Sequence, residues 1–235
     1  MHPDFVKFLG FKWMYNGKMR YFVFLVLPFG LCSGPRICKK LFRPLVVFWR
    51  DLGILNIIFY DDGIVAGMSY DDCKKKGEIV FDTLMRAHIL PNCKKSVWKP
   101  TKICDWLGYT WCYDNYEVKV VSRRITQLKD RIIALKSDYP VVTPRKVAKV
   151  VGSFISMQLV FQDKVLLHSR FLQHVVNFRE IADLSWDTKL NVNIVDKGHK
   201  ILEEMDFLLE NLGQLKFSFF QSAVTRSFCL CGGRE

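Results

Sequence analysis

The sequence predicts an α+β fold in which short strands and a few helices are followed by a helical region. Up to about residue 112, short runs rich in β-branched and aromatic residues are bounded by turn residues, which is typical of strands. From Ser122 onward, apolar residues recur at the spacing of an amphipathic helix. Half of the 235 residues are hydrophobic and 14% are aromatic, which is enough for a packed core. Disorder is therefore excluded as the main state of the chain.

A β-hairpin is predicted near the N-terminus. Residues 8–14 and 19–24 are strand-like, and Asn16-Gly17 lies between them. Asn-Gly in this position favours a tight two-residue turn, because both central residues of that turn adopt positive φ.

The next elements follow from the same kinds of signal. We expect a helix over 35–52, strands over 55–60 and 64–66, a helix over 71–87, and strands around 96–98 and 106–111. Pro44 lies inside the first of these helices and removes an amide donor, so a kink or two shorter helices are expected there. Asp61-Asp62-Gly63 is expected to form the turn between the two apolar strands.

Helices dominate the second half of the chain. A helix begins at Ser122, and Thr143-Pro144 predicts another start, because Thr caps helices and Pro suits the first helical position. Further helices are expected over 163–180 and 195–212.

The charge of the chain is strongly positive and unevenly distributed. The formal net charge is +12, and residues 91–150 hold 13 basic and 5 acidic groups, whereas residues 151–235 hold 9 and 10. Such a surface favours a polyanionic partner, either nucleic acid or an anionic membrane. Acidic residues flank the dense basic run at 74–76, which argues against a membrane-surface helix.

No targeting signal is visible in the sequence. The first residues lack a basic segment followed by an apolar run, so no signal peptide is expected. The longest apolar run, residues 21–31, is shorter than the roughly 20 residues that a membrane span needs. We therefore expect an intracellular protein, in the cytoplasm or nucleus, with no membrane partner. The eight cysteines form no Cys-x-x-Cys pair, so reduced thiols are expected rather than a zinc site or disulfides.

The most informative local feature is a pair of carboxylates at the tip of an apolar hairpin. Asp61 and Asp62 directly follow the strand expected over 55–60. Two like charges on a tight turn repel each other, and bound divalent cations would offset that repulsion. Carboxylate oxygens suit Mg²⁺, and two such ions can support displacement at a phosphate. The alternative interpretation is a solvated Asp-Asp-Gly turn without a ligand.

Five sequence boxes, in this order, resemble those of reverse transcriptases. They are Lys7-Phe8-Leu9-Gly10-Phe11 with the Asn16-Gly17-Lys18 turn, Leu27-Pro28-Phe29-Gly30-Leu31-Cys32-Ser33-Gly34-Pro35, Phe59-Tyr60-Asp61-Asp62, Leu90-Pro91-Asn92-Cys93-Lys94-Lys95-Ser96, and Trp106-Leu107-Gly108-Tyr109. The third is similar to the Tyr-x-Asp-Asp box of that family, with Phe in place of the usual Tyr. The residues of these boxes most resemble those of retrotransposon enzymes of the tyrosine-recombinase (DIRS-like) group.

The resemblance implies a partial palm and a helical thumb of an RNA-directed DNA polymerase, which is a nucleotidyltransferase. Residues 1–115 would form the partial palm, 116–195 the thumb or connection, and 196–235 a degenerate lead-in to a missing RNase H domain. The implied partners are a primed RNA or DNA template and dNTPs. The implied cofactor is Mg²⁺ or Mn²⁺ at a two-metal site.

The resemblance also implies roles for individual residues. They are metal binding and catalysis by Asp61 and Asp62, protonation of pyrophosphate by Lys95, contact with nucleotide and template by Phe29, Gly30 and Tyr60, and a primer grip formed by Trp106, Leu107, Gly108 and Tyr109. In the alternative interpretation, Phe29 and Trp106 are core residues and Lys95 is a solvated charge.

The sequence also departs from the family. Reverse transcriptases carry a third carboxylate in an Asp-Leu-x-x-Gly-Tyr-His context that would precede Lys7, and the fingers would lie there too, but neither is present. Asp4 is a poor substitute. We therefore expect an N-terminally truncated, catalytically incomplete chain with an unpaired sheet edge beside the Asp61 hairpin. Residues 221–223 lack the carboxylate that opens RNase H in the family, so no RNase H activity is expected.

A non-catalytic nucleic-acid binder is the second hypothesis. Trp98, Trp106, Tyr109 and Trp111 are interleaved with the basic residues of 91–150, and aromatic faces can stack on bases. The competing interpretation is that these aromatic residues form a core while the lysines keep the fold soluble. The sequence leaves both interpretations open.

Overall fold

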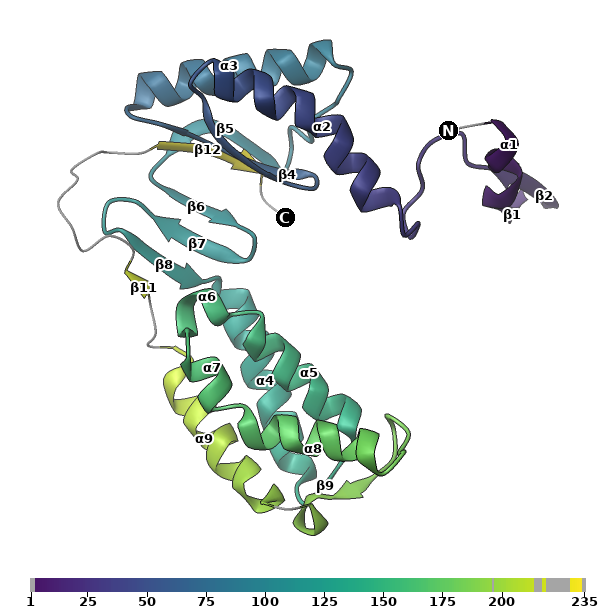
Figure 1. Cartoon of the computed structure of the whole chain (residues 1–235), viewed down its shortest axis with the longest axis vertical. Helices are drawn as coiled ribbons and strands as arrows, with labels where there is room; N and C mark the ends of the chain where they lie inside the picture. The colour runs from purple at the N-terminus through teal and green to yellow at the C-terminus, as the bar shows by residue number, and fades with distance from the viewer. Residues whose placement is uncertain (1–2, 196, 214–216, 219–228, 234–235) are drawn as a thin grey trace.

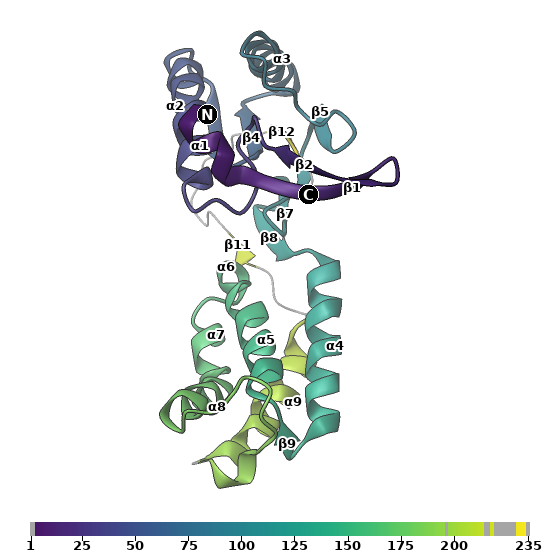
Figure 2. The same cartoon turned by 90° about the vertical axis from the view of Figure 1, so that its right-hand side faces the viewer.

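The computed structural model describes residues 3–195, 197–213, 217–218 and 229–233, which form the α+β fold that the sequence predicts. Figure 1 shows a hairpin set apart from the rest, a sheet covered by two helices, a second sheet and a helical bundle. Figure 2 shows the covered sheet and the bundle at opposite ends of the molecule. None of the described helices is long and apolar enough to cross a membrane.

The N-terminal hairpin forms as predicted. A short helix, α1 (Pro3–Val6), and a 3₁₀ turn, η1 (Lys7–Leu9), lead into β1 (Gly10–Tyr15), which pairs antiparallel with β2 (Lys18–Val23). Asn16 and Gly17 form the turn with φ angles of 51° and 72°, as the Asn-Gly signal requires. Both strands are exposed along their whole length.

A four-stranded sheet carries the carboxylate pair. Its strands are, in spatial order, β3 (Leu55–Phe59), β4 (Asp62–Gly67), β12 (Cys229–Gly233) and β5 (Ser96–Thr101). Helices α2 (Gly34–Asp51) and α3 (Tyr70–Arg86) cover one face of this sheet (Figure 1). Buried side chains of the helices and strands form a small core between the layers, which consists of Trp49, Ile54, Val65, Cys73, Val80 and Leu84.

The two covering helices follow their sequence signals with one exception. Helix α2 continues through Pro44, so the alternative of two shorter helices is wrong, while the alternative of a kink stays a prediction. Fully buried Trp49 anchors this helix to the core, and such packing outweighs the single hydrogen bond that a proline removes. Helix α3 is capped by Ser69, whose hydroxyl accepts the amide of Asp72 at 3.1 Å.

The C-terminal strand overturns a second expectation. The β4 edge of the Asp61 hairpin is paired, because β12 lies between β4 and β5 and pairs antiparallel with both, and β3 is the edge strand of the described sheet. Gly232 pairs with Ile64 on one side and with Val97 on the other. Strands β4 and β5 therefore run parallel to each other, and each begins at the same end of the sheet.

A second sheet connects the first sheet to the bundle (Figure 1). Its strands are, in spatial order, β11 (Phe217–Ser218), β8 (Glu117–Val120), β7 (Tyr109–Cys112) and β6 (Ile103–Trp106). The single strand expected over 106–111 is therefore wrong. Leu107 and Gly108 adopt φ angles of 51° and 75° and form a tight turn between β6 and β7.

The bundle contains most of the remaining helices. Its elements are α4 (Ser122–Asp138), β9 (Val141–Val142), α5 (Pro144–Ile155), α6 (Gln158–Phe161), α7 (Lys164–Leu167), α8 (Arg170–Ile181), β10 (Leu190–Asn191), η2 (Val192–Ile194), η3 (Gly198–Lys200) and α9 (Ile201–Asn211). The larger hydrophobic core lies here and includes Leu128, Val147, Phe154, Leu172 and Met205. The cap at Thr143 is confirmed, since its hydroxyl accepts the amide of Lys146 at 3.4 Å.

Two helix boundaries in the bundle differ from expectation. The helix expected over 163–180 is divided into α7 and α8, where buried Ser169 donates its hydroxyl to the carbonyl of Val165 at 2.6 Å. The helix expected over 195–212 begins only at Ile201. The expected domain boundary after residue 115 lies in the turn between β7 and β8, and residue 196 is not described. The division into three parts therefore stays a prediction.

Glu204 of α9 caps the neighbouring helix α8. Its carboxylate accepts the amides of Phe171 at 2.9 Å and Leu172 at 2.8 Å, which belong to the first turn of α8 and lack partners within that helix. Glu204 is only 4% exposed. Its burial raises the pKa of the carboxyl above its ordinary value, although the backbone amides act in the opposite direction.

Replacing this buried cap tests its contribution to stability. We expect Glu204→Gln to lower the free energy of unfolding by about 1–3 kcal/mol, because an amide cannot accept both backbone hydrogen bonds. The pKa of Glu204 is higher in the folded than in the unfolded chain, so its contribution is full below about pH 4.5 and is lost as the pH rises through the folded-state pKa. Urea unfolding of both chains at several pH values measures this. A stability difference that grows with rising pH would contradict the assignment.

Candidate functional site

The carboxylate pair lies at the tip of the β3–β4 hairpin. Phe59 pairs with Asp62, so Tyr60 and Asp61 form the turn, with Tyr60 at a φ of 56°. The turn was expected at Asp61-Asp62-Gly63, and this prediction is wrong. The observed turn begins one residue earlier and ends two residues earlier. Gly63 lies in β4, where a Cβ atom would come within 2.7 Å of the Ile58 side chain. This glycine allows close packing inside the hairpin and is not needed for the turn.

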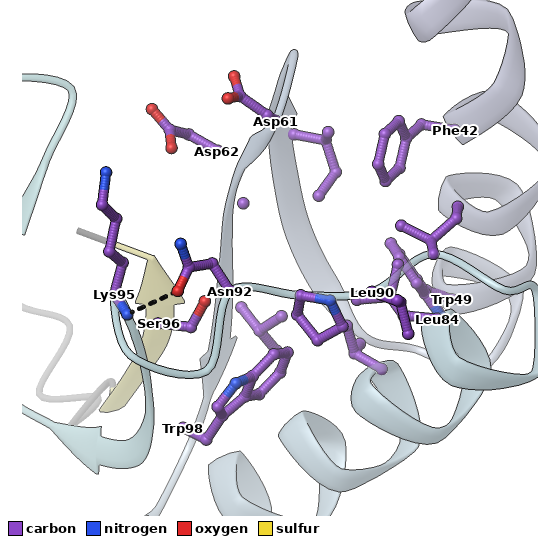
Figure 3. A pocket seen from close by; sticks show the side chains of 16 residues that line it. Phe42, Trp49, Asp61, Asp62, Leu84, Leu90, Asn92, Lys95, Ser96 and Trp98 are labelled. Carbon is purple, nitrogen blue, oxygen red and sulfur yellow. Dashed lines mark hydrogen bonds between the residues drawn. The ribbon is translucent and has the colours of Figure 1, made fainter. Parts of the chain in front are cut away.

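The two carboxylates differ in environment. Asp61 is exposed and Asp62 is half-buried, and Figure 3 shows both side chains projecting from the tip of the hairpin. The turn itself is contacted from α2, where the Sγ atom of Cys38 lies 3.9 Å from the carbonyl oxygen of Tyr60. The hairpin tip is therefore held beside the first turns of α2.

Lys95 reaches the same end of the sheet from a different segment. It precedes β5, and β5 begins at the end of the sheet where β4 begins, because both strands pair antiparallel with β12. The side chain of Asn92 orders this loop, since its Oδ1 atom accepts the amides of Lys94 at 3.2 Å and Lys95 at 3.3 Å. Figure 3 shows the Lys95 side chain projecting on the same side as Asp61 and Asp62.

A pocket of about 570 Å³ lies between these segments. Its polar lining residues are Asp61, Asp62, Asn92, Lys95 and Ser96, and its apolar lining includes Phe42, Trp49, Val80, Leu84, Leu90 and Trp98. Trp98 is fixed by an edge-on contact with Phe81, with ring centroids 5.1 Å apart. The pocket thus combines an acidic and basic rim with a rigid apolar wall (Figure 3).

The carboxylate pair alone does not make a metal centre. Within the described parts of the chain, no group of three or more His, Cys, Asp or Glu side chains is placed to hold a metal ion. The residues of β12 nearest this end of the sheet are Gly232 and Gly233, which carry no ligating side chain. The side chains of the described residues therefore do not supply the full ligand set of a two-metal site.

The other residues singled out by sequence lie outside the pocket lining. Phe29 and Gly30 lie in the loop before α2, where Phe29 is fully exposed. Tyr60 lies at the hairpin turn and packs edge-on against Phe59, with ring centroids 4.8 Å apart. Their roles toward nucleotide and template stay predictions. Phe29 is not a core residue, so that alternative is wrong.

The expected primer grip forms a junction with the bundle. The hydroxyl of Tyr109 donates to the carbonyl of Ser156 at 2.8 Å. Arg124 of α4 donates to the carbonyl of Gly108 at 3.0 Å and to that of Ser156 at 2.9 Å. Its guanidinium also lies 5.3 Å from the centroid of the Tyr109 ring. The tip of the β6–β7 hairpin is thus fastened to the C-terminal end of α5.

The aromatic side chains singled out in 91–150 are partly buried by packing and are not fully exposed to solvent. Trp98, Trp106, Tyr109 and Trp111 are all half-buried, and Tyr109 and Trp111 pack against the core of the bundle. Sequence reasoning missed Arg124, which joins the second sheet to α5. No local signal could have identified it, because Ser156 lies 32 residues further along the chain.

Comparison with known proteins gives one informative match. The chain is similar to the "Retrovirus-related Pol polyprotein from transposon opus" of Drosophila melanogaster, with 32% identity over 94 residues. The match covers 40% of this chain and 9% of that polyprotein, so the chain spans about a tenth of the length of this relative. No family model matches the sequence, and no solved structure matches it.

A substitution at Gly108 tests the junction. A Cβ atom there would lie 2.5 Å from Nη1 of Arg124, and the φ of 75° disfavours any L side chain. We expect Gly108→Ala to lower the free energy of unfolding by about 2–3 kcal/mol, because the backbone is strained and Arg124 must leave its carbonyl partners. Urea unfolding measures this change.

Gly152→Ala is the matched control. Gly152 lies within α5 and has nothing within 4 Å of its added Cβ atom. Alanine there is expected to stabilise the chain by about 0.5–1 kcal/mol, since it reduces the entropy lost on forming the helix. Equal effects of the two substitutions would contradict the junction.

Proposed function

We propose that this chain derives from the reverse transcriptase part of a retrotransposon Pol polyprotein, with a partial palm and a thumb. In this form it binds a primer–template hybrid but does not extend the primer. The observation that carries the proposal is that Asp61, Asp62 and Lys95 line one pocket. Two sequence boxes more than twenty residues apart thereby supply carboxylates and an ammonium group to one rim.

The chemistry of this rim suits the handling of phosphates. An ammonium group binds phosphate oxygens and can donate a proton to a departing oxygen atom. Carboxylates are the ligands through which polymerases hold Mg²⁺ beside the phosphates of a nucleotide. Because the side chains in the described parts of the chain do not supply a complete two-metal site, our proposal includes no nucleotidyl-transfer step. Its remaining role is to bind nucleic acid.

The comparison supports the origin. The matching Drosophila protein is a retrovirus-related Pol polyprotein of a transposon, and it shares 32% identity over 94 residues. The fastening of the β6–β7 hairpin to α5 also supports the proposal, since a primer grip must be held rigidly against a thumb. Assignment of the chain to the tyrosine-recombinase group of retrotransposons depends on the residues of the five boxes and stays a prediction. The lead-in to RNase H expected over 196–235 depends partly on residues 221–223, which lie outside the described residues.

A non-catalytic nucleic-acid binder remains the second candidate. The net charge of residues 91–150 and the absence of a three-ligand metal group among the described residues both favour it. It differs from the first candidate in requiring no recognition of the primer end. A remnant of this kind would bind single strands and hybrids with similar affinity.

One assay separates these candidates. A labelled DNA primer annealed to an RNA template is mixed with the whole chain, Mg²⁺ and dNTPs, and both complex formation and primer length are followed. We expect a complex that weakens steeply with added salt and no lengthening of the primer. Binding of the hybrid that is at least several-fold tighter than binding of the single strands would favour the polymerase origin.

Two results would contradict the proposal. Primer extension that is abolished by Asp61→Asn would show a working active site and would refute the inactivity. Failure to bind the hybrid at low salt would refute the proposed function as a whole. Asp51→Asn serves as the control, because Asp51 is an acidic residue outside the pocket lining.

A further inference from the structure

The N-terminal hairpin exposes an aromatic and basic face, which we define as Phe11, Trp13, Tyr15, Lys18, Arg20 and Phe22. We propose that this aromatic face binds single-stranded nucleic acid, with bases stacked on its rings and phosphates on its two cations. The proposal does not depend on Asp61, Asp62 or Lys95. It concerns a different surface from the pocket, and its test needs neither metal ions nor dNTPs.

The register of the hairpin brings these side chains together. Phe11 pairs with Phe22, Trp13 with Arg20, and Tyr15 with Lys18. Alternate residues of a strand point to opposite faces, so all six share one face while Lys12, Met14, Met19 and Tyr21 share the other.

The rings of Phe11, Phe22 and Tyr15 are in contact and form a platform, and Trp13 lies on the same face. The rings of Phe11 and Phe22 are stacked with centroids 5.6 Å apart, and those of Tyr15 and Phe22 meet edge-on at 6.4 Å. The guanidinium of Arg20 lies 5.4 Å from the centroid of the Tyr15 ring, which places a cation beside the platform. Strands of this length make the face about 20 Å long, enough for several nucleotides.

The platform is open to solvent. Trp13 is 64% exposed and Tyr15 is 50% exposed. Figure 1 shows the hairpin away from both sheets and the bundle. This is unlike Tyr109 and Trp111, which pack against the core of the bundle and leave little ring surface for a ligand. Exposed apolar surface of this extent marks an interaction site.

Charge identifies the occupant as a polyanion. No acidic residue occurs between residues 5 and 50, whereas nine lysines and arginines do. Besides Lys18 and Arg20 on the aromatic face, α2 contributes exposed Arg36, Lys39 and Lys40 next to the loop that follows the hairpin. A second copy of the chain docking face to face would bring like charges together, which disfavours pairing. Nucleic acid supplies both the negative charge and flat rings for stacking.

A single strand fits better than a duplex. The flat faces of bases are free in a single strand and are covered by neighbouring base pairs in a duplex. Aromatic stacking therefore selects unpaired bases, and it does so with little dependence on sequence because every base has such a face.

The test measures binding of a fluorescent oligo(dT) to the whole chain in EDTA by anisotropy. We expect Trp13→Ala to weaken binding about tenfold, in the range found for loss of one base–aromatic stack. Tyr21→Ala is the matched control, because Tyr21 is an even more exposed aromatic residue on the opposite face. It should change affinity less than about twofold. Trp13→Phe keeps a ring in place and should restore most of the affinity, which separates stacking from misfolding.

A second pair of variants tests the phosphate contacts. Arg20→Gln should reduce the slope of log affinity against log salt by about 0.7, the value for one phosphate contact on a single strand. Lys12→Gln removes the same charge from the opposite face and should leave the slope unchanged.

Several outcomes would overturn the proposal. These are no binding of oligo(dT) at low salt, equal losses for Trp13→Ala and Tyr21→Ala, or a Trp13→Ala loss that is as large for a blunt duplex as for oligo(dT). A dimer that Trp13→Ala converts to a monomer, without oligonucleotide binding, would assign the aromatic face to a second copy of the chain. If oligo(dT) binds as expected but a primer–template hybrid does not, the proposed function fails while this inference stands.

Discussion

The arrangement of the candidate site depends on the pairing of one strand, β12, with both β4 and β5. Neighbouring strands lie about 4.8 Å apart, so β12 sets a separation of about 10 Å between β4 and β5. It also makes these strands parallel, which puts Asp62 at the start of β4 and Ser96 at the start of β5 at the same end of the sheet. Without β12, nothing in the backbone pairing would connect the carboxylate hairpin to the loop that carries Lys95.

The same strand also determines which residues lie beside the carboxylate pair. A central strand beside β4 is well placed to bring a third carboxylate to Asp61 and Asp62. Among the described residues of β12, those at that position are Gly232 and Gly233, which bring no carboxylate there. Pairing of the strands of this sheet therefore does not by itself supply further metal ligands. The described part of the fold holds the two carboxylates at one end of the sheet, with no third carboxylate from β12 beside them.

Short sequence motifs predicted the turns and helix ends that depend on neighbouring residues in the chain. Asn16-Gly17 identified the first hairpin because its turn needs positive φ, and Thr143 identified a helix start because its hydroxyl caps a nearby amide. The sequence could not predict β12, since its partners lie more than 120 residues earlier in the chain. The register of the Asp61 turn was missed because Gly63, which suggested a turn, lies in β4 against the Ile58 side chain.

The Asp61 hairpin and the Lys95 loop share one rim because β12 bridges their strands. Paramagnetic Mn²⁺, titrated into the ¹⁵N-labelled chain, tests this arrangement, because even weak binding to exposed carboxylates broadens the amide signals of nearby residues. We expect signals of residues 61–63 and 92–96 to broaden together in a chain that ends at residue 233. In a chain that ends at residue 228 and lacks β12, only the signals of 61–63 should broaden. Broadening of 61–63 alone in the longer chain would contradict the account.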